Sequence, residues 1–399
     1  MTKRTIHRYT AQIAKTALIA LPLALLSACQ QSDTPEPQPK PQDQVPLQLT
    51  SGISTTITRA YDATWENNDK IGVFTVAAGG TTASDITTSG NYPDANIPYQ
   101  ITIDATHNDN SGATYATGSV ASSDYNASNQ TPKDFAPLTT EGSKTIYLPL
   151  DGSNVDVYAY YPFTSTTTPT TITDPGVTIS SDQQTLTVNL ETTQTADGQI
   201  TYDLMHAFAL SSSSPINIDH ASAQLLFKHC LTKVLIVVKA GTGYSGDTDL
   251  ANTSVTLKSL PNAATFLPLT QTLNVKNSVS NIIPYKLTEA TTDHDDYTKK
   301  EDGMYIYRAL VLPNTADGST FIVNGNNASD YTRQIEITVG STNTATYTYT
   351  INPTAYPFKA GEEIKFDIEL LATGITITAA IRPWSEHSEV PEATLYETE

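Results

Sequence analysis

Short runs of alternating apolar and polar residues recur along the chain from about residue 48, separated by clusters of Gly, Pro, Asn, Asp and Ser. Helical periodicity is almost absent. The pattern predicts strands at 48–57, 70–76, 144–148, 156–161, 176–179, 185–190, 223–238, 254–260, 303–311, 321–323, 334–339, 347–351, 363–370 and 374–381. Such a density of short strands indicates an all-β fold made of antiparallel β-sandwiches, and not βαβ units.

Length and composition are consistent with two such domains. The chain has 399 residues, and its 21 Tyr against 9 Phe and 3 Met are typical of β-rich proteins. We expect two β-sandwich domains in tandem, an N-terminal one at 49–215 and a C-terminal one at 216–399. The predicted boundary follows the serine run at 211–214, and the second domain ends in an acidic tail.

Residues 1–28 have the pattern of a bacterial lipoprotein signal peptide. Four basic residues come first, and the apolar run at 16–26 that follows is too short to span a bilayer. The run ends in Leu-Ser-Ala-Cys, with small residues before the predicted cut and a thiol, that of Cys29, able to carry a lipid. An ordinary secretory signal with a chance cysteine is the alternative. Lipidation of Cys29 would anchor the chain to a membrane without spanning it.

A proline-rich tether is predicted after Cys29, so that residues 29–48 form an extended spacer with nothing to bury. The signal holds four of the 22 Lys and Arg and none of the 41 Asp and Glu. Removing it therefore changes the net charge from −19 to −23. Because so acidic a chain repels phosphate backbones, nucleic-acid binding is excluded.

Candidate chemistry is sparse. The patterns Gly-x-Ser-x-Gly, His-Glu-x-x-His and Cys-x-x-Cys are absent, and the scattered histidines are interpreted as structural. The densest group of potential metal ligands, Asp-His-Asp-Asp at 293–296, lacks the spacing of a calcium loop and is interpreted as a solvated acidic loop. Cys230 is interpreted as a small buried hydrophobe. We expect no enzyme activity, no cofactor and no bound metal.

Five groups of segments form a set when they are taken in order along the chain. They are Trp-Glu-Asn-Asn-Asp-Lys-Ile-Gly-Val-Phe at 65–74, Val-Tyr-Ala-Tyr-Tyr-Pro-Phe at 157–163, Tyr-Asp-Leu-Met-His-Ala at 202–207 with Leu-Leu-Phe-Lys-His-Cys at 225–230, Arg-Ala-Leu-Val-Leu-Pro at 308–313, and Phe-Lys-Ala-Gly-Glu at 358–362 continuing through 375–384. Together they resemble the fimbrillin-like (type V pilin) lipoprotein family of the Bacteroidia. Within the first, Gly72 would allow close packing against a neighbouring strand.

The resemblance implies export to the outer membrane as a lipoprotein, cleavage by an arginine-specific protease, and assembly into a surface fimbria. Cleavage would remove an early strand, and a terminal strand of another pilin subunit would fill the exposed groove. The sequence offers a removable strand whose apolar residues are Leu47, Leu49, Ile53 and Ile57. It also offers a donor or final strand whose alternating residues are Ile375, Ile377, Ala379 and Ile381.

Arg59 directly follows the candidate removable strand, in a polar stretch that a protease could reach. It is the only arginine between Arg8 and Arg308. We therefore expect processing between Arg59 and Ala60. The alternative interpretation is an ordinary solvated turn residue.

These features favour a structural or adhesive pilin subunit whose partners are other pilin subunits and, for adhesion, a host protein or glycan. The alternative is a monomeric surface lipoprotein that binds host or dietary glycans through Tyr and Asn in its long loops. A hydrolase on a β-sandwich would need convergent carboxylates, and the sequence does not pair any.

Overall fold

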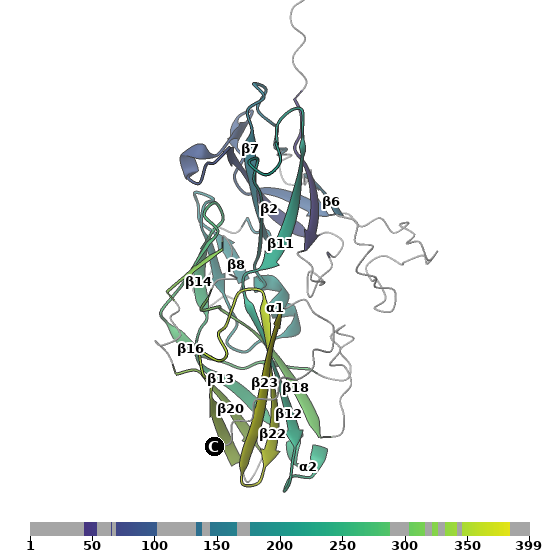
Figure 1. Ribbon diagram of the computed structural model, residues 1–399, viewed down its shortest axis with the longest axis vertical. Helices are drawn as coiled ribbons and strands as arrows, with labels where there is room; N and C mark the ends of the chain where they lie inside the picture. Colours follow the sequence, from purple (N-terminus) through teal and green to yellow (C-terminus); the bar gives the residue numbers. More distant parts are fainter. Residues whose placement is uncertain are drawn as a thin grey trace, which may run out of the picture. The chain divides into compact units, whose positions relative to one another are not determined.

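Strands dominate the computed structural model, which describes residues 44–53, 65, 69–101, 133–137, 144–165, 176–287, 303–315, 321–325, 332–340 and 345–383 (Figure 1). The predicted all-β class is confirmed. Two short α-helices, α1 at Ala196–Tyr202 and α2 at Gly246–Leu250, and a 3-10 turn at Ala83–Asp85 lie between strands. No helix in the described ranges is long and apolar enough to cross a membrane.

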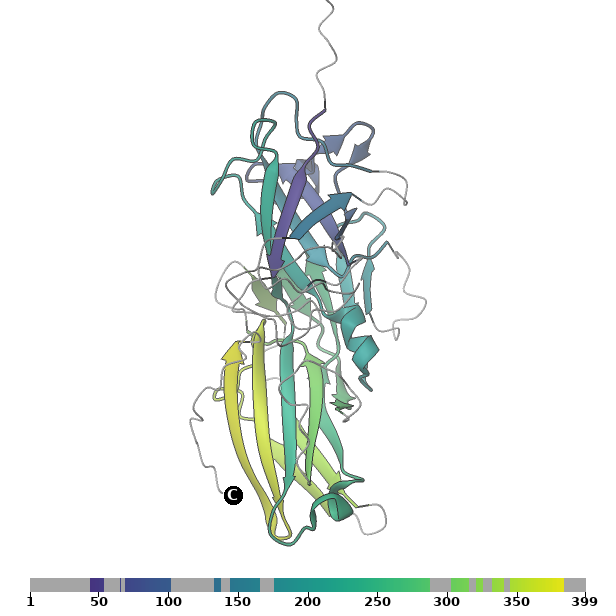
Figure 2. The ribbon, with the colours of Figure 1, turned by 90° about the vertical axis from the view of Figure 1, so that its right-hand side faces the viewer.

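The first sheet closes on itself in the order β1-β11-β10-β7-β2-β5-β6 (Figures 1 and 2). Its strands are β1 Gln48–Ile53, β2 Lys70–Ala77, β5 Ile97–Ile101, β6 Lys133–Pro137, β7 Val155–Tyr161, β10 Met205–Ala209 and β11 Ser222–His229. A first hydrophobic core fills the inside of this closed sheet.

Strands β2 and β7 carry apolar residues on both faces because they separate two cores. Val73 and Val157 point into the first core, whereas Phe74 and Tyr160 belong to a second core on the opposite face. Every residue of β7 is buried as a result. Burial on both faces accounts for the continuous apolar runs in this part of the sequence.

The second core is covered by a sheet in the order β19-β15-β14-β9-β8. Its strands are β8 Gly176–Ile179, β9 Leu186–Asn189, β14 Ala263–Leu267, β15 Thr272–Val275 and β19 Ile322–Asn324. In this sheet β9 pairs with β14, and Val188 lies opposite Ala264. Strands from before and after residue 215 therefore share one sheet. The tandem domains 49–215 and 216–399 stay a prediction.

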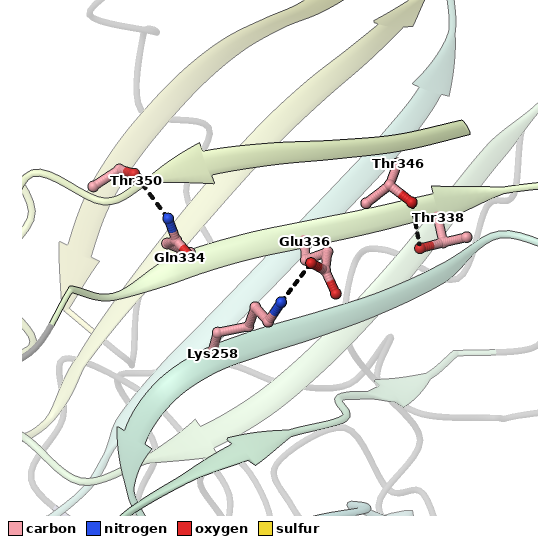
Figure 3. A network of polar contacts seen from close by, with 6 residues as sticks. All are labelled: Lys258, Gln334, Glu336, Thr338, Thr346 and Thr350. Atoms are coloured by element: carbon pink, nitrogen blue, oxygen red, sulfur yellow. Dashed lines mark hydrogen bonds and ion pairs between the residues drawn. The ribbon is translucent and has the colours of Figure 1, made fainter. Parts of the chain in front are cut away.

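A third core lies between two further sheets. One has the order β17-β18-β12-β22-β23, with strands Tyr285–Lys286, Met304–Val311, Thr232–Ala240, Glu362–Leu371 and Gly374–Pro383. The other has the order β16-β13-β20-β21, with strands Val279–Ile282, Ser254–Pro261, Gln334–Val339 and Ala345–Thr350. The outer face of the sheet β16-β13-β20-β21 is polar, and Figure 3 shows the ion pair of Lys258 with Glu336 on it. The Nζ–Oε2 distance of this pair is 2.5 Å.

The single strand predicted at 223–238 is wrong, because the chain forms two strands there. β11 ends at His229 in the closed sheet, and β12 begins at Thr232 in a sheet around the third core. Cys230 and Leu231 connect them and are buried in the second core, so the apolar run hides the break. Burial of Cys230 agrees with its interpretation as a small hydrophobe.

Most strand pairs are antiparallel, as the predicted fold class requires, but three pairs among the described strands are parallel. Strand β1 is parallel to β11, β12 is parallel to β22, and β15 is parallel to β19. Parallel neighbours need long connections. Here each pair joins strands that are far apart in sequence, which a local apolar–polar pattern does not report.

Buried hydrogen bonds join helix α1 and the residues before it to β18. Arg308 Nε donates to Gln199 Oε1 at 2.8 Å, and Gln194 Nε2 donates to the carbonyl of Leu310 at 2.7 Å. Burial lowers the pKa of Arg308 to about 10, and the nearby charge of Glu363 opposes this shift. A hydrogen bond to a charged group contributes about 1.5–3 kcal/mol, so these contacts help to fix α1 against the sheet of β18.

We predict that Gly72→Ala lowers the free energy of unfolding by about 1–3 kcal/mol, the usual range for an overpacked core. A Cβ at residue 72 would lie 2.2 Å from Tyr160 Cε1 and 2.6 Å from Asn96 Oδ1. Urea unfolding followed by circular dichroism measures the effect. Gly374→Ala is the matched control, because a Cβ there meets nothing within 4 Å. Equal midpoints for the two variants would contradict the close packing at Gly72.

Candidate functional site

Strand β1 fills the gap between β6 and β11, and we call this gap the β1 groove. The strand runs parallel to β11, with Thr50 opposite Gln224, and antiparallel to β6, with Leu49 opposite Phe135. In Figures 1 and 2 it is the purple strand of the closed sheet. Because both of its edges are paired, β1 supplies the ladder that closes the sheet.

From Leu47, directly before β1, alternate residues point into the first core. Leu47 is 2% exposed and Leu49 is 1% exposed, whereas Gln48 is exposed on the other face. The structure therefore places two of the four residues predicted for the removable strand in the core. Ile53 ends the strand opposite Phe227. Ile57 lies outside the described residues.

Ser51 is the third inward position of β1, and the sequence interpretation overlooked it. Its side chain is 1% exposed, and its hydroxyl has no hydrogen-bond partner among the described residues. A buried hydroxyl without a partner costs about 1–3 kcal/mol. Side chains alternate between the two faces of a strand, so residue 51 shares the inner face with residues 47 and 49. This alternation could have predicted that Ser51 is buried.

Trp65 fills the centre of the first core beside the β1 groove. Its ring makes edge contacts with Phe135, Tyr161 and Phe227, with centroids 5.1, 5.5 and 5.0 Å away. Phe135 lies on β6 and Phe227 on β11, the two strands that border the groove. The indole therefore packs on both walls of the groove, and Leu47 and Leu49 belong to the same core.

A second set of contacts holds the residues just before β1. The amide of Leu47 donates to the carbonyl of Ile146, and the amide of Leu148 donates to the carbonyl of Val45, both at 2.9 Å. The segment 144–148 is held in turn by the hairpin of β3, Thr88–Ser89, and β4, Tyr92–Pro93. The hydroxyl of Tyr92 donates to the carbonyl of Thr145 at 2.7 Å.

The candidate donor strand lies at the edge of its sheet. In the described part of the chain, β23 pairs with β22 alone, over ten residues. Ile377 is buried against the third core, Ile375 and Ala379 are half-buried, and Ile381 is 38% exposed. An edge strand with partly exposed apolar residues is suited to pair with another chain.

The other predicted site residues, Cys29, Arg59 and Ala60, lie outside the described residues, as does the acidic cluster at 293–296. Within the described ranges, no group of three His, Cys, Asp or Glu is placed to hold a metal ion.

Two of the histidines are buried and hydrogen-bonded, as a structural role requires. His229 Nδ1 lies 3.0 Å from Asp203 Oδ1. His206 Nδ1 bonds Gln271 Oε1, and its ring stacks on Phe321 with centroids 4.7 Å apart. These contacts explain both residues without a catalytic role.

A family model described as "Fimbrillin-like" matches residues 58–384. The chain belongs to the fimbrillin-like family. This confirms the resemblance inferred from the motifs, and the family is one of fimbrial subunits and not a class of enzymes. The match begins at residue 58, next to Arg59, and ends at Trp384, just after β23.

Several known proteins from Bacteroides are similar to this fimbrillin-like chain. A "Putative fimbrium subunit Fim1C" of Bacteroides uniformis is 27% identical over 375 residues, which are 93% of this chain and 95% of the relative. A solved structure of a "putative cell adhesion protein" from Bacteroides uniformis has a TM-score of 0.51 at 21% identity, covering 87% of this chain and 100% of the other. Another, from Bacteroides ovatus, has a TM-score of 0.53 at 18% identity, covering 86% and 99%. Both structures share the fold.

We predict that Leu49→Ala lowers the free energy of unfolding of this fimbrillin-like chain by about 2–5 kcal/mol, because it leaves a cavity in the first core. Thr50→Ala, on the opposite face of the same strand, is the matched control and should cost far less. Equilibrium urea unfolding compares the two. Equal losses would mean that β1 does not pack as an integral strand of the closed sheet.

Proposed function

We propose that this chain is a structural or adhesive subunit of a bacterial surface fimbria that assembles by protease-triggered β-strand exchange. One observation carries the proposal. Strand β1 is paired on both edges within the closed sheet. It is also the first of the described strands and lies only a few residues before Arg59 in the sequence. A cut after Arg59 would separate β1 covalently from everything that follows it.

Loss of β1 would create a strong acceptor for another strand. The backbone groups of β6 and β11 that now pair with β1 would lose their partners, and the positions of Leu47 and Leu49 would become cavities beside Trp65. Unpaired edges and empty apolar pockets are the two features that drive β-strand addition. A strand of a neighbouring subunit would restore both.

The donor in this proposal is β23 of the neighbouring subunit. It has apolar residues in alternation, and two of them, Ile375 and Ala379, are only partly buried against the third core. In the described part of the chain it follows every other strand, so its release would leave the order of the preceding strands unchanged.

Export would proceed through the signal peptide and lipidation of Cys29. The proline-rich segment 29–48 would then hold the folded part away from the outer membrane, with its last residue already in β1. The lipid would keep the unprocessed subunit at the membrane until cleavage releases β1 together with the anchor. Cleavage at Arg59 would therefore couple release from the membrane to opening of the groove.

The substrate is the protein expressed from Gln30 to its last residue. We predict that an arginine-specific protease cuts it to give a new N-terminus at Ala60, and that the cut protein then forms multimers that resist detergent. Terminal sequencing and unboiled gels measure the two results. Arg59 should be cut first, because Arg308 and Arg333 are buried. Arg382 precedes Pro383, and the bond to a proline is a poor protease substrate.

Arg59→Lys is the control, because it keeps the positive charge and removes the cleavage site. It should stay intact and monomeric under the same treatment. If the wild-type chain were cut at Arg59 and remained monomeric, assembly by strand exchange would be contradicted. A monomeric lipoprotein that binds glycans would then be the better interpretation.

A further inference from the structure

We propose that residues 375–381 of a neighbouring copy replace residues 47–53 position by position in the β1 groove, and that Ser51 weakens the resident strand relative to its replacement. This inference rests on the proposed function and adds to it the register of the incoming strand and the cause of the direction of exchange. Its partner is a second copy of this chain.

The two segments have matching side-chain patterns. Residues 47–53 read Leu-Gln-Leu-Thr-Ser-Gly-Ile, and residues 375–381 read Ile-Thr-Ile-Thr-Ala-Ala-Ile. Both have large aliphatic residues at the first, third and seventh positions, a small residue at the fifth, and polar residues at the second and fourth. In the reverse direction, the small residue of the donor would fall at the third position, so only the forward direction matches.

The groove accepts one register of this donor. In the aligned register, Ile375 and Ile377 take the positions of Leu47 and Leu49, and Ala379 takes the position of Ser51. A shift by one residue would turn the apolar side chains out of the core. A shift by two would put Ile377 at the small fifth position or Ala379 at the position of Leu49, giving overpacking or a cavity.

Ser51 gives the exchange its direction. Its hydroxyl is buried and has no partner in the described part of the chain, so the resident strand loses a hydration shell there without a compensating hydrogen bond. Ala379 would present a methyl group to the same pocket and lose no hydrogen bond to water. The incoming strand therefore fits the fifth position better than the strand it replaces.

The ladder of hydrogen bonds adds to this difference. Within its own sheet β23 is an edge strand, and the described residues pair it with β22 alone. In the β1 groove the same residues would pair with both β11 and β6, as β1 does. Ile375 is half-buried in its own sheet. In the groove it would take the position of Leu47, which is only 2% exposed, and would become more buried.

Disulfide trapping between subunits tests the register. Thr50 lies opposite Gln224, so the proposed register brings Thr378 of the donor opposite Gln224 of the acceptor. Copies that carry T378C and Q224C should cross-link into ladders on non-reducing gels after the cut at Arg59. The matched control is T378C with L226C, because Leu226 lies opposite Gly52, two residues along, and is exposed on the same face. The control pair should give at most about a tenth of the ladder.

The cross-linking pattern separates the register of the donor strand from strand exchange itself. Ladders from the 226 pair in place of the 224 pair would overturn the register while leaving strand exchange intact. Ladders of equal strength from both pairs would also overturn it, since the donor would then have no fixed register. Absence of detergent-resistant multimers from the parent chain, which carries no introduced cysteine, would overturn the proposed function together with this inference.

The role of Ser51 has its own test. S51A should slow the appearance of multimers after cleavage by about tenfold, because it removes the unpaired hydroxyl from the resident strand. A379S should lower the temperature at which assembled multimers dissociate, because it moves that hydroxyl into the donor. T50A and T378S alter outward positions and serve as controls. Unchanged assembly of S51A would overturn the claim that Ser51 sets the direction of exchange.

Discussion

The closure of the first sheet depends on β1. Without this strand, β6 and β11 would present unpaired backbone groups at two facing edges, and the first core would lose Leu47 and Leu49. Buried backbone groups must be paired, so the sheet needs a strand at this position. Nothing in that requirement demands that the strand belong to the same chain, and this is the physical basis of the exchange between subunits that we propose.

The surrounding structure is built to keep the groove in shape. Strands β2 and β7, which belong to the same closed sheet, are packed on both faces. The ring of Trp65 lies in the core and packs against Phe135 of β6 and Phe227 of β11, the two strands that border the groove. These parts lie after Arg59 in the sequence, so cleavage there would leave the walls of the acceptor covalently intact.

The sequence pattern predicted what depends on local periodicity and missed what depends on distant pairing. The all-β class and the apolar positions Leu47 and Leu49 follow from alternation within short segments. The parallel pairing of β1 with β11 joins residues more than 160 positions apart, so a local pattern does not report it. The inward position of Ser51 follows from the alternation of β1, but a polar residue there gives no apolar signal. The break between β11 and β12 was missed because the connecting residues are as apolar as the strands.

Hydrogen–deuterium exchange read by mass spectrometry on the intact, the cleaved and the assembled chain tests the central claim most directly. The account predicts that the amides of β11 lose protection after the cut at Arg59 and regain it when multimers form, whereas β12, in the middle of its sheet, stays protected throughout. Protection of β11 that survives the loss of β1, or that does not return on assembly, would contradict an acceptor groove between β6 and β11.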